Sequence, residues 1–357
     1  MKLLGYIKKN QDNIKETPLN ICDALVVSWV AYFDFSIVKD RLPLTFNDFD
    51  YIPEYKRLEP YYFSYFPRFS RRYLKCLINS ERFKDAKVVD YEYILDRKKG
   101  IQFAVVAVKF DSQIIIAVRG TDPSYAGWKE DFTLSYSDRM HAYAYAEEFI
   151  QRVIKRHKKE KIILCGHSKG GNISTYMLSQ LEDVSMIEHV YSFDGPGFRI
   201  KGLFKGKEDR LEKFTKIVPQ SSIVGVLFSN ETDIKIIKSK AVMFLQHNPF
   251  EWVVKDNDFV YLTKRTLSSR HLEKALNAWI ESLNPEDRER FTEIIFGELE
   301  KFDADDFVVF FKKLLLQIGP VYKAYRGLSK EDKKLVYRVV KKLIRNMIKP
   351  EKQKLIA

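Results

Sequence analysis

The sequence KIILCGHSKGGNISTYM, residues 161–177, changes character at its midpoint. It begins with apolar, mostly β-branched residues, as a buried strand does, and it ends in residues that favour a helix. Between them lies GHSKG, in which a glycine stands two residues before and two residues after Ser168. A strand that leads through G-x-S-x-G into a helix is typical of a nucleophile elbow, a sharp turn that exposes a reactive serine. The stretch therefore predicts a nucleophile at Ser168, with its hydroxyl at the start of a helix over 169–181.

Composition indicates a large globular chain in a reducing compartment. The 357 residues are 45% hydrophobic and 14% aromatic, enough to bury a sizeable core. Cys22, Cys76 and Cys165 are odd in number, far apart and without C-x-x-C spacing, so they indicate neither a disulfide framework nor a zinc site. The first apolar run is too short for a secretory signal, and no segment offers about 18 uninterrupted apolar residues. We expect a soluble, cytoplasmic protein, and peripheral membrane attachment stays open.

Glycine-rich phosphate-binding loops are not indicated. The sequence contains no G-x-G-x-x-G, and GLFKGK at 202–207 has the wrong spacing for a P-loop and is followed by Glu208. A serine nucleophile with a histidine base needs no metal or cofactor, and we expect none.

Strands alternate with helices on both sides of the quoted stretch. Three β-rich runs between residues 88 and 119 are separated by short polar joins, which predicts an antiparallel entry into a sheet. A helical pattern near 141–157 precedes the strand at 161, and the runs HVYSFD (189–194) and FTKIVPQ (214–220) predict two later strands. This order predicts an α/β fold with a mostly parallel central sheet.

From about residue 263 the pattern is helical to the end. Capping signals predict helix starts at Asn284, Asp303 and Ser329. We therefore expect three segments: a polar N-terminal tail (1–16), an α/β domain (17–262) and an all-helical, basic C-terminal extension (263–357).

A nucleophilic serine of this type needs a histidine base that follows it in the chain. Only His189, His247 and His271 lie after Ser168. His189 begins a strand, at the wrong end of the sheet, and His271 lies in a helical pattern. His247, in MFLQHNPFEW, stands in a break before an Asn-Pro turn, so it is the predicted base.

The acid that orients the histidine is predicted at Asp194. This residue ends the strand HVYSFD and is followed by Gly-Pro-Gly, so its carboxylate emerges at the carboxyl edge of the sheet, where α/β ligand sites gather. A local turn-capping role is the alternative. Asp233, Asp256 and Asp258 are weaker candidates for the acid.

The oxyanion donors are expected at two strand ends. The backbone N–H of Lys169 follows the nucleophile, and the run AVRGTD (117–122) places Thr121 after an earlier strand, where its N–H or hydroxyl is the second predicted donor. Trp128, Glu130 and Asp131 are expected to fix that loop.

The pair AVRGTD and CGHSKGG resembles the class 3 lipases, which have the α/β-hydrolase fold. The segments NICDALVVSWVAYFDF, GWKEDF, SFDGPGF, VPQSSIVGVLF and LQHNPFEW are still more similar to a bacterial branch of lipase-like proteins of undefined substrate. The resemblance covers roughly residues 17–260 and leaves the helical extension outside.

The resemblance implies Ser168 as nucleophile, Thr121 as oxyanion residue and His247 as base. It departs from the class 3 pattern at the acid, whose position falls on Ser222, a residue that cannot serve as an acid. Asp194 instead matches the acid position of pancreatic-type lipases, one strand earlier. Lys169 replaces a common leucine, and its side chain is expected either to meet an anionic head group or to be solvated.

We therefore expect a serine hydrolase, lipase- or esterase-like, that cleaves a carboxylic ester through Ser168, His247, Asp194 and an acyl-enzyme. Two alternatives stay open. One is an acyltransferase that uses the same triad, and the other is an inactive hydrolase scaffold that binds lipid or protein.

The net charge of +13 is concentrated at the C-terminal end. Residues 311–357 carry 14 Lys and Arg against three Asp and Glu, which accounts for +11 of it. The segment 333–349 places eight apolar residues on one helical face and basic residues on the other. A terminal helix packed on the protein is one interpretation, and a helix lying on an anionic membrane surface is the other. Nucleic acid is disfavoured.

Overall fold

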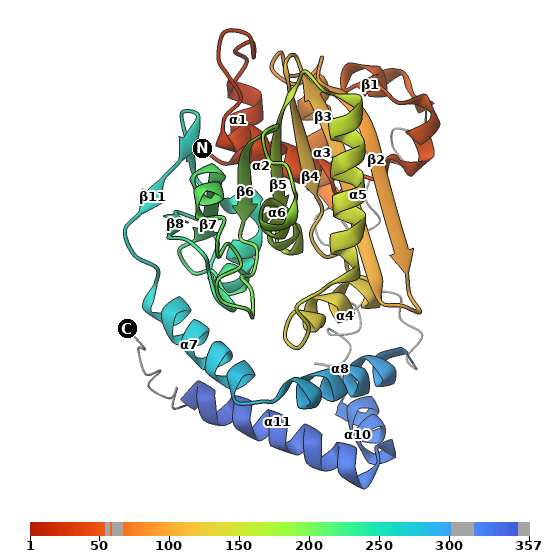
Figure 1. Ribbon diagram of the computed structural model, residues 1–357, viewed down its shortest axis with the longest axis vertical. Coiled ribbons are helices and arrows are strands. Elements are labelled where there is room, and N and C mark those ends of the chain that lie inside the picture. Colours follow the sequence, from red (N-terminus) through yellow and green to blue (C-terminus); the bar gives the residue numbers. More distant parts are fainter. Residues whose placement is uncertain (54–57, 59–66, 301–317, 349–357) are drawn as a thin grey trace. The chain divides into compact units, whose positions relative to one another are not determined.

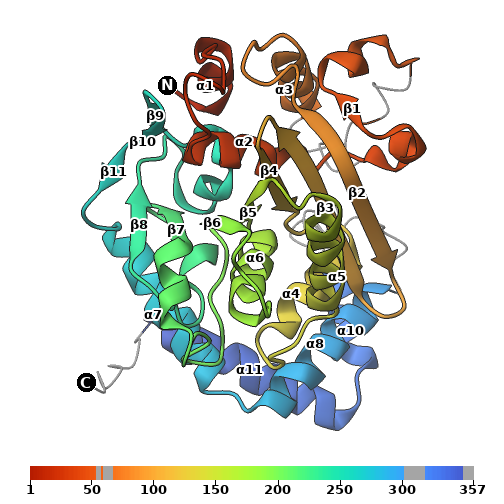
Figure 2. The ribbon, with the colours of Figure 1, turned by 45° about the horizontal axis from the view of Figure 1, so that its top comes forward.

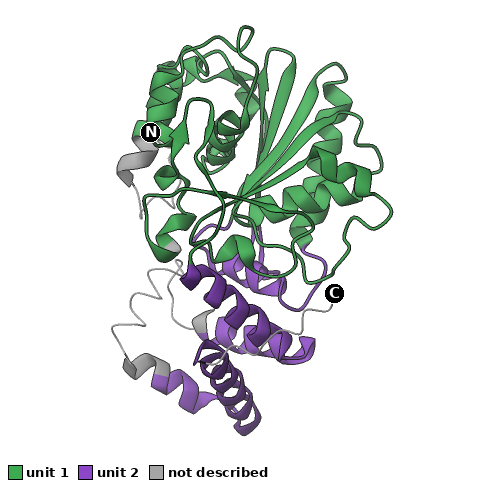
Figure 3. Ribbon diagram, turned by 90° about the vertical axis from the view of Figure 1, so that its left-hand side faces the viewer, with its two compact units in different colours: residues 1–94, 103–120, 141–266 green, residues 95–102, 121–140, 267–357 purple. Residues whose placement is uncertain are grey.

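The protein is described here from a computed structural model, which describes residues 1–53, 58, 67–300 and 318–348. The chain forms two compact units, coloured separately in Figure 3. The first comprises Met1–Ile94, Phe103–Gly120 and His141–Thr266, and the second comprises Leu95–Gln102, Thr121–Met140 and Leu267–Ala357. The sequence predicts three consecutive segments, whereas these units interleave, because two earlier segments group with the C-terminal helices.

A nine-stranded mixed sheet is the centre of the first unit (Figure 1). Its order is β1-β2-β3-β4-β5-β6-β7-β8-β11. Strand β3 pairs antiparallel with β4, and the neighbours from β4 to β8 all pair in parallel. The strands are β1 (Leu44–Thr45), β2 (Lys87–Asp96), β3 (Ile101–Phe110), β4 (Gln113–Val118), β5 (Lys161–His167), β6 (Ile187–Phe193), β7 (Phe214–Pro219), β8 (Ile234–Ile237) and β11 (Tyr261–Leu262), and β9 (Val254–Lys255) forms a separate hairpin with β10 (Asp258–Phe259).

Helices cover both faces of this sheet (Figure 2). On one face, α6 (Lys169–Gln180) packs on β5 and β6, and α5 (His141–Arg156) packs against α6. On the other face, α2 (Ile21–Val30) contacts β4 and β5. The other helical elements of this unit are α1 (Leu3–Lys9), α3 (Pro67–Ile78) and the short helices η1 (Phe35–Arg41), η2 (Asn47–Tyr51), η5 (Glu208–Lys213), η6 (Val224–Val226), η7 (Met243–His247) and η8 (Pro249–Glu251). Because both faces are covered, the parallel strands are buried along most of their length.

The N-terminal residues, predicted as a polar tail, include helix α1. Leu3, Tyr6 and Ile7 recur at a spacing of three and four residues and are fully buried. The Tyr6 hydroxyl donates to Asp23, which is also paired with Arg82 at 2.6 Å in a fully buried salt bridge. The hydrophobic core of the first unit therefore begins at the third residue.

The second unit is helical in its described part. It contains α4 (Tyr125–Thr133), α7 (Leu267–Glu281), α8 (Pro285–Glu300), α10 (Ile318–Gly327) and α11 (Lys330–Ile348). The predicted caps are confirmed at two helix starts, where the side chains of Asn284 and Ser329 accept hydrogen bonds from backbone N–H groups of the first turn. The predicted start at Asp303 lies outside the described residues. A small core between α8 and α11 contains Ile294, Leu335 and Val339, together with Leu283 just before α8.

The strand order, the helices on both faces and the turn between β5 and α6 make this an α/β-hydrolase fold with a helical C-terminal region, as predicted. Within the ranges that the structure describes, no single helix is both long and apolar enough to cross a bilayer. Among the same residues, one pair of helices, α2 and η1, meets both criteria when taken together, but it is bent by 98°.

Candidate active site

Ser168 lies at a strained turn between β5 and α6. Its φ of 57° and ψ of −131° are rare for a residue with a side chain, and strain of this kind is concentrated at functional sites. The flanking glycines make the turn possible, because a Cβ on Gly166 would lie 2.2 Å from the carbonyl carbon of Gly170. Ser168 itself is partly exposed at the N-terminus of α6. The geometry is that of a nucleophile elbow.

His247 is in direct contact with Asp194. The distance from His247 Nδ1 to Asp194 Oδ2 is 2.7 Å, and the imidazole remains 29% exposed. A carboxylate only accepts hydrogen bonds, so Nδ1 carries the proton and donates it to Asp194. The other ring nitrogen, Nε2, then has a lone pair. The imidazole is thus in the tautomer that a general base requires.

Asp194 is fixed in place from two further sides. It is fully buried, with a φ of 51°. Its second oxygen, Oδ1, accepts a hydrogen bond from the Ser222 hydroxyl at 2.5 Å and another from the Gly225 N–H at 3.2 Å. Ser222, at the position where the resemblance places the acid, thus donates to the carboxylate one strand earlier. These bonds hold the Asp194 carboxylate in a single orientation.

The histidine next to the nucleophile supports the loop of His247. His167 Nε2 lies 2.8 Å from the backbone carbonyl oxygen of His247, so this nitrogen is protonated and donates. His167 Nδ1 then accepts from the Tyr32 hydroxyl at 3.1 Å. Burial, reinforced by the neighbouring His247, lowers the pKa of His167 to about 3. His167 is therefore a neutral link that connects Tyr32, two residues after α2, to the backbone of His247.

Aromatic residues surround this link. Trp29 and Tyr32 stack on each other at 4.4 Å, and Trp29 also contacts the His167 ring. The Trp252 indole donates to the backbone oxygen of Gln246 at 2.7 Å, one residue before His247. Two consecutive carbonyl groups of the loop are thus held by buried side chains.

The same loop presents apolar side chains to solvent. Val242, Met243 and Leu245 are 67%, 65% and 48% exposed, although they lie within five residues of His247. Met243 has a φ of 48°, a conformation that few non-glycine residues adopt. An exposed apolar segment next to a candidate base is a surface on which an apolar substrate can lie.

The two predicted oxyanion residues have different surroundings. Lys169 is the first residue of α6, where backbone N–H groups have no acceptor within the helix, and its side chain is only 1% exposed. The expectation of a solvated Lys169 side chain is therefore wrong. Gly120 lies against the nucleophile, since a Cβ there would stand 2.9 Å from Ser168 Cβ, and Thr121 is the next residue in the chain.

The loop after Thr121 is tied down within the second unit. The Thr121 hydroxyl donates to Asp131 Oδ2 at 2.6 Å, and Glu130 accepts from the Gln102 N–H. Two of the residues predicted to fix this loop thus do so. Because the Thr121 hydroxyl is engaged with Asp131, its N–H is the better candidate for an oxyanion donor.

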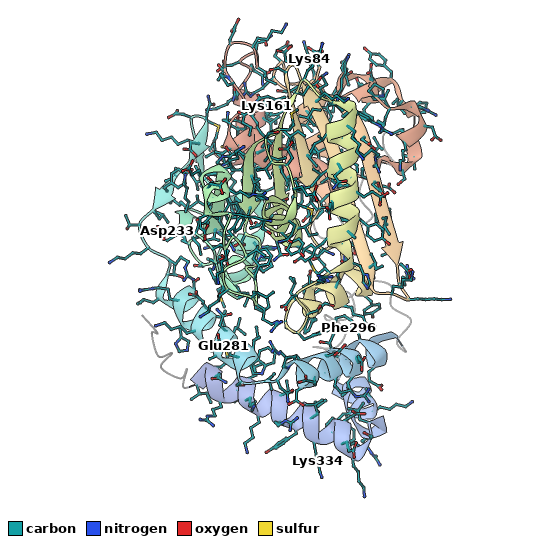
Figure 4. The ribbon with its side chains drawn as sticks, viewed as in Figure 1. Lys84, Lys161, Asp233, Glu281, Phe296 and Lys334 are labelled. Atoms are coloured by element: carbon teal, nitrogen blue, oxygen red, sulfur yellow. The ribbon has the colours of Figure 1, made fainter. Side chains whose placement is uncertain are left out.

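The alternative acids and bases have other partners. Asp233 is exposed at the start of β8 (Figure 4), Asp256 is exposed, and Asp258 accepts from the Tyr261 hydroxyl. His189 contacts the Thr215 hydroxyl, and His271 contacts the backbone oxygen of Met347. Each was disfavoured from the sequence, and of the four candidate acids, all of them described residues, Asp194 is the one hydrogen-bonded to His247.

A buried lysine lies close to this group. Lys216 in β7 is 4% exposed, pairs in register with Ser192 of β6, and donates to the Asn230 side chain. Burial lowers the pKa of Lys216 to about 7, although the attraction of Asp194 opposes this shift. The sequence analysis did not consider this residue.

The sequence analysis did not identify three residues that support the site: His167, Tyr32 and Ser222. The position of His167, directly before the nucleophile, was the one available signal. Tyr32 is 135 residues away from His167, so no local pattern connects them. Ser222 was judged only as a replacement for the acid, and its capacity to donate to an acid elsewhere was overlooked.

Comparisons with known proteins find one family model and several solved structures that are similar to this chain. The family model described as Mbeg1-like matches residues 77–297, more than half of the chain. Among solved structures, a lipase from Rhizopus microsporus var. chinensis is 14% identical with a TM-score of 0.38, covering 71% of this chain and 78% of that one. The M37 lipase is 17% identical with a TM-score of 0.36, covering 57% and 68%.

The Lip2 lipase from Yarrowia lipolytica is 16% identical with a TM-score of 0.34, covering 56% of this chain and 78% of that one. No curated protein matches the sequence. At these low TM-scores we assign the fold from the strand order and the elbow rather than from the individual similarities.

Proposed function

The chain belongs to the Mbeg1-like family, and from this premise we propose that it is a serine hydrolase that cleaves carboxylic esters. The observation that carries the proposal is the contact of 2.7 Å between His247 and Asp194 in a chain whose Ser168 occupies a nucleophile elbow. The order Ser168, Asp194, His247 along the chain is the order found in α/β-hydrolases.

In the proposed reaction, Ser168 Oγ attacks the ester carbonyl and His247 Nε2 takes its proton. Asp194 keeps Nδ1 protonated and stabilises the imidazolium that forms. His247 then donates the proton to the departing alcohol, which leaves an acyl-enzyme on Ser168. Water, deprotonated by the same Nε2, attacks the acyl carbonyl and releases the acid and the free serine.

The oxyanion of each tetrahedral intermediate needs preorganised donors. We assign the first to the backbone N–H of Lys169, because it begins α6 and the helix dipole favours negative charge there. The N–H of Thr121 is the proposed second donor.

The exposed residues Val242, Met243 and Leu245 support an ester with an apolar acyl chain as the substrate. The cysteines are free, which agrees with the proposed cytoplasmic location. We also propose that the chain belongs to a bacterial branch of lipase-like proteins, because segments such as SFDGPGF and LQHNPFEW resemble that branch.

Labelling by a fluorophosphonate probe tests the proposal, because the probe reacts with activated serines. We expect the wild-type chain to be labelled, Ser168→Ala not to be labelled, and Ser185→Ala, at an exposed serine outside the site, to be labelled normally. A folded wild-type chain that resists the probe would overturn the proposal and favour an inactive scaffold.

Product analysis distinguishes the hydrolase from an acyltransferase with the same triad. With a short-chain ester and an added alcohol, a hydrolase gives mainly the free acid. If the alcohol instead receives most of the acyl groups, the reaction class is wrong although the residue assignment stands.

A further inference from the structure

Helix α11 carries two apolar stripes, of which one is packed and one is exposed. The sequence predicts a single apolar face on this helix. In the structure, Leu335 and Val339 are 8% and 0% exposed and belong to the small core of the second unit. The indole of Trp279 in α7 donates to the backbone oxygen of Val339 at 3.0 Å, which fixes this side of α11.

The second stripe points to solvent. It consists of apolar side chains that are between 40% and 71% exposed: Tyr337, Val340, Ile344, Met347 and Ile348. With 3.6 residues per turn, Tyr337, Val340 and Ile344 lie within about 60° of one another around the helix. This spacing makes a continuous stripe about three turns long, which we call the outer stripe.

Basic side chains border the outer stripe. Lys334, labelled on α11 in Figure 4, and Lys341 are exposed, and Lys341 Nζ lies 5.6 Å from the centre of the Tyr337 ring. Between residues 318 and 348 the chain has nine Lys and Arg against only two acidic residues, Glu331 and Asp332. Asp332 is already paired with Arg290 of α8. The surface around the stripe is therefore strongly positive.

We propose that the outer stripe of α11 docks on the surface of an anionic lipid bilayer. An amphipathic helix in the bilayer interface buries aliphatic and aromatic residues just below the headgroups and leaves lysines at the level of the lipid phosphates. Both components are present on the same side of α11. Association of two copies through this stripe would bring two strongly positive surfaces together, and nucleic acid offers no apolar surface for three aliphatic side chains.

The proposal is independent of the ester chemistry, and its test does not use catalysis. Full-length protein carrying Ser168→Ala, which leaves the lipids intact, is sedimented with vesicles of phosphatidylcholine alone or with about 30% phosphatidylserine added. We expect binding only to the anionic vesicles, weakened by salt. Because each basic residue near such a surface strengthens binding about fivefold, Lys334→Gln with Lys341→Gln should weaken it about 25-fold.

A second variant, Ile344→Gln with Ile348→Gln, tests the apolar component and should weaken binding at least tenfold without changing the net charge. Its matched control is Ile200→Gln, an exposed isoleucine of the first unit, which should bind as the parent does. All of these side chains are exposed, so the variants should fold, and circular dichroism verifies this.

Undiminished binding of the Ile344→Gln, Ile348→Gln variant would overturn the proposal, and so would equal binding to neutral vesicles. A dimer in solution that the same variant dissociates, without vesicle binding by the parent, would assign the stripe to a second copy. Fluorophosphonate labelling of the wild-type chain is unaffected by each of these outcomes, so the two proposals fail separately.

Discussion

The turn around Ser168 and helix α11 both combine apolar residues with lysines. These side chains are buried at the turn and exposed on one side of α11. At the turn, Lys169 is 1% exposed and β5 is buried after its first residue. On α11, Lys334 and Lys341 are exposed beside a stripe of exposed apolar side chains. The first region acts through contacts inside the protein, whereas the second presents its chemistry to the outside. Substitutions in the two regions should therefore affect different measurements.

The largest effect is expected at Asp194. In Asp194→Asn the amide can donate to His247 Nδ1, which moves the imidazole proton to Nε2 and removes the base. We expect kcat for a short-chain ester to fall about 10⁴-fold with little change in KM.

Asp233→Asn is the matched control, because Asp233 was the competing acid and is exposed. It should change kcat less than twofold. A larger loss of kcat in Asp233→Asn than in Asp194→Asn would assign the acid to Asp233. The contact between Asp194 and His247 would then have no catalytic role.

A smaller effect is expected at His167, which donates to the backbone oxygen of His247 and packs its ring against the His247 ring at 4.5 Å. Loss of its hydrogen bond in His167→Phe should let the loop move and lower kcat about 30-fold, since small displacements of a catalytic group are costly. KM should stay within twofold.

Two measurements distinguish a role of His167 in positioning His247 from a general loss of protein stability. His167→Gln, which can still donate to the carbonyl oxygen, should recover much of the lost kcat, and Tyr32→Phe should lose less than His167→Phe. A loss in His167→Phe that follows only the fraction of folded protein would show that His167 has a structural role alone.

These residues also show what the sequence could predict about the site. Ser168 belongs to a local motif, and His247 and Asp194 follow from chain order and strand ends, so each could be named before the structure brought the last two into contact. Their catalytic roles stay predictions. The links through His167 and Ser222 could not be foreseen, because a neutral histidine and a hydroxyl leave no periodic signal and their partners are distant in sequence.

The same limit applies to the fold. Periodicity predicted the strands β5 to β7, helices α5 and α6, and the two described C-terminal helix starts, because these depend on local patterns. It failed at α1, where a short helix among lysines gave no clear pattern, and at α11, where both stripes contribute to one hydrophobic period. Which stripe is covered depends on the position of α7 and α8, and helical periodicity alone carries no such information.

The buried Lys216 should make stability depend on pH. Its ordinary pKa is 10.5 and burial lowers it to about 7, so between these values the unfolded chain binds a proton that the native chain lacks. The free energy of unfolding should therefore rise with pH, by up to about 1.4 kcal/mol per unit.

Lys216→Met should remove this slope. Urea unfolding between about pH 7 and 8.5 compares the variant with wild type, and any contribution from the titration of the cysteines is common to both chains. Lys235→Met, at an exposed lysine of β8, should keep the slope. Parallel slopes in wild type and Lys216→Met would mean that Lys216 stays protonated in the native protein.

The smallest effect separates the two stripes of α11 with neighbouring valines. Val339 is fully buried and Val340 is 42% exposed. Val339→Ala should destabilise α11 by about 1 to 2 kcal/mol through the cavity it leaves, and Val340→Ala should change stability by less than about 0.5 kcal/mol, because alanine favours a helix and no packing is lost. Hydrogen exchange of the α11 amides measures both, and it should be about tenfold faster in Val339→Ala alone. Equal acceleration in both variants would show that the outer stripe is packed in solution, and α11 would then resemble the interior of β5 rather than differ from it.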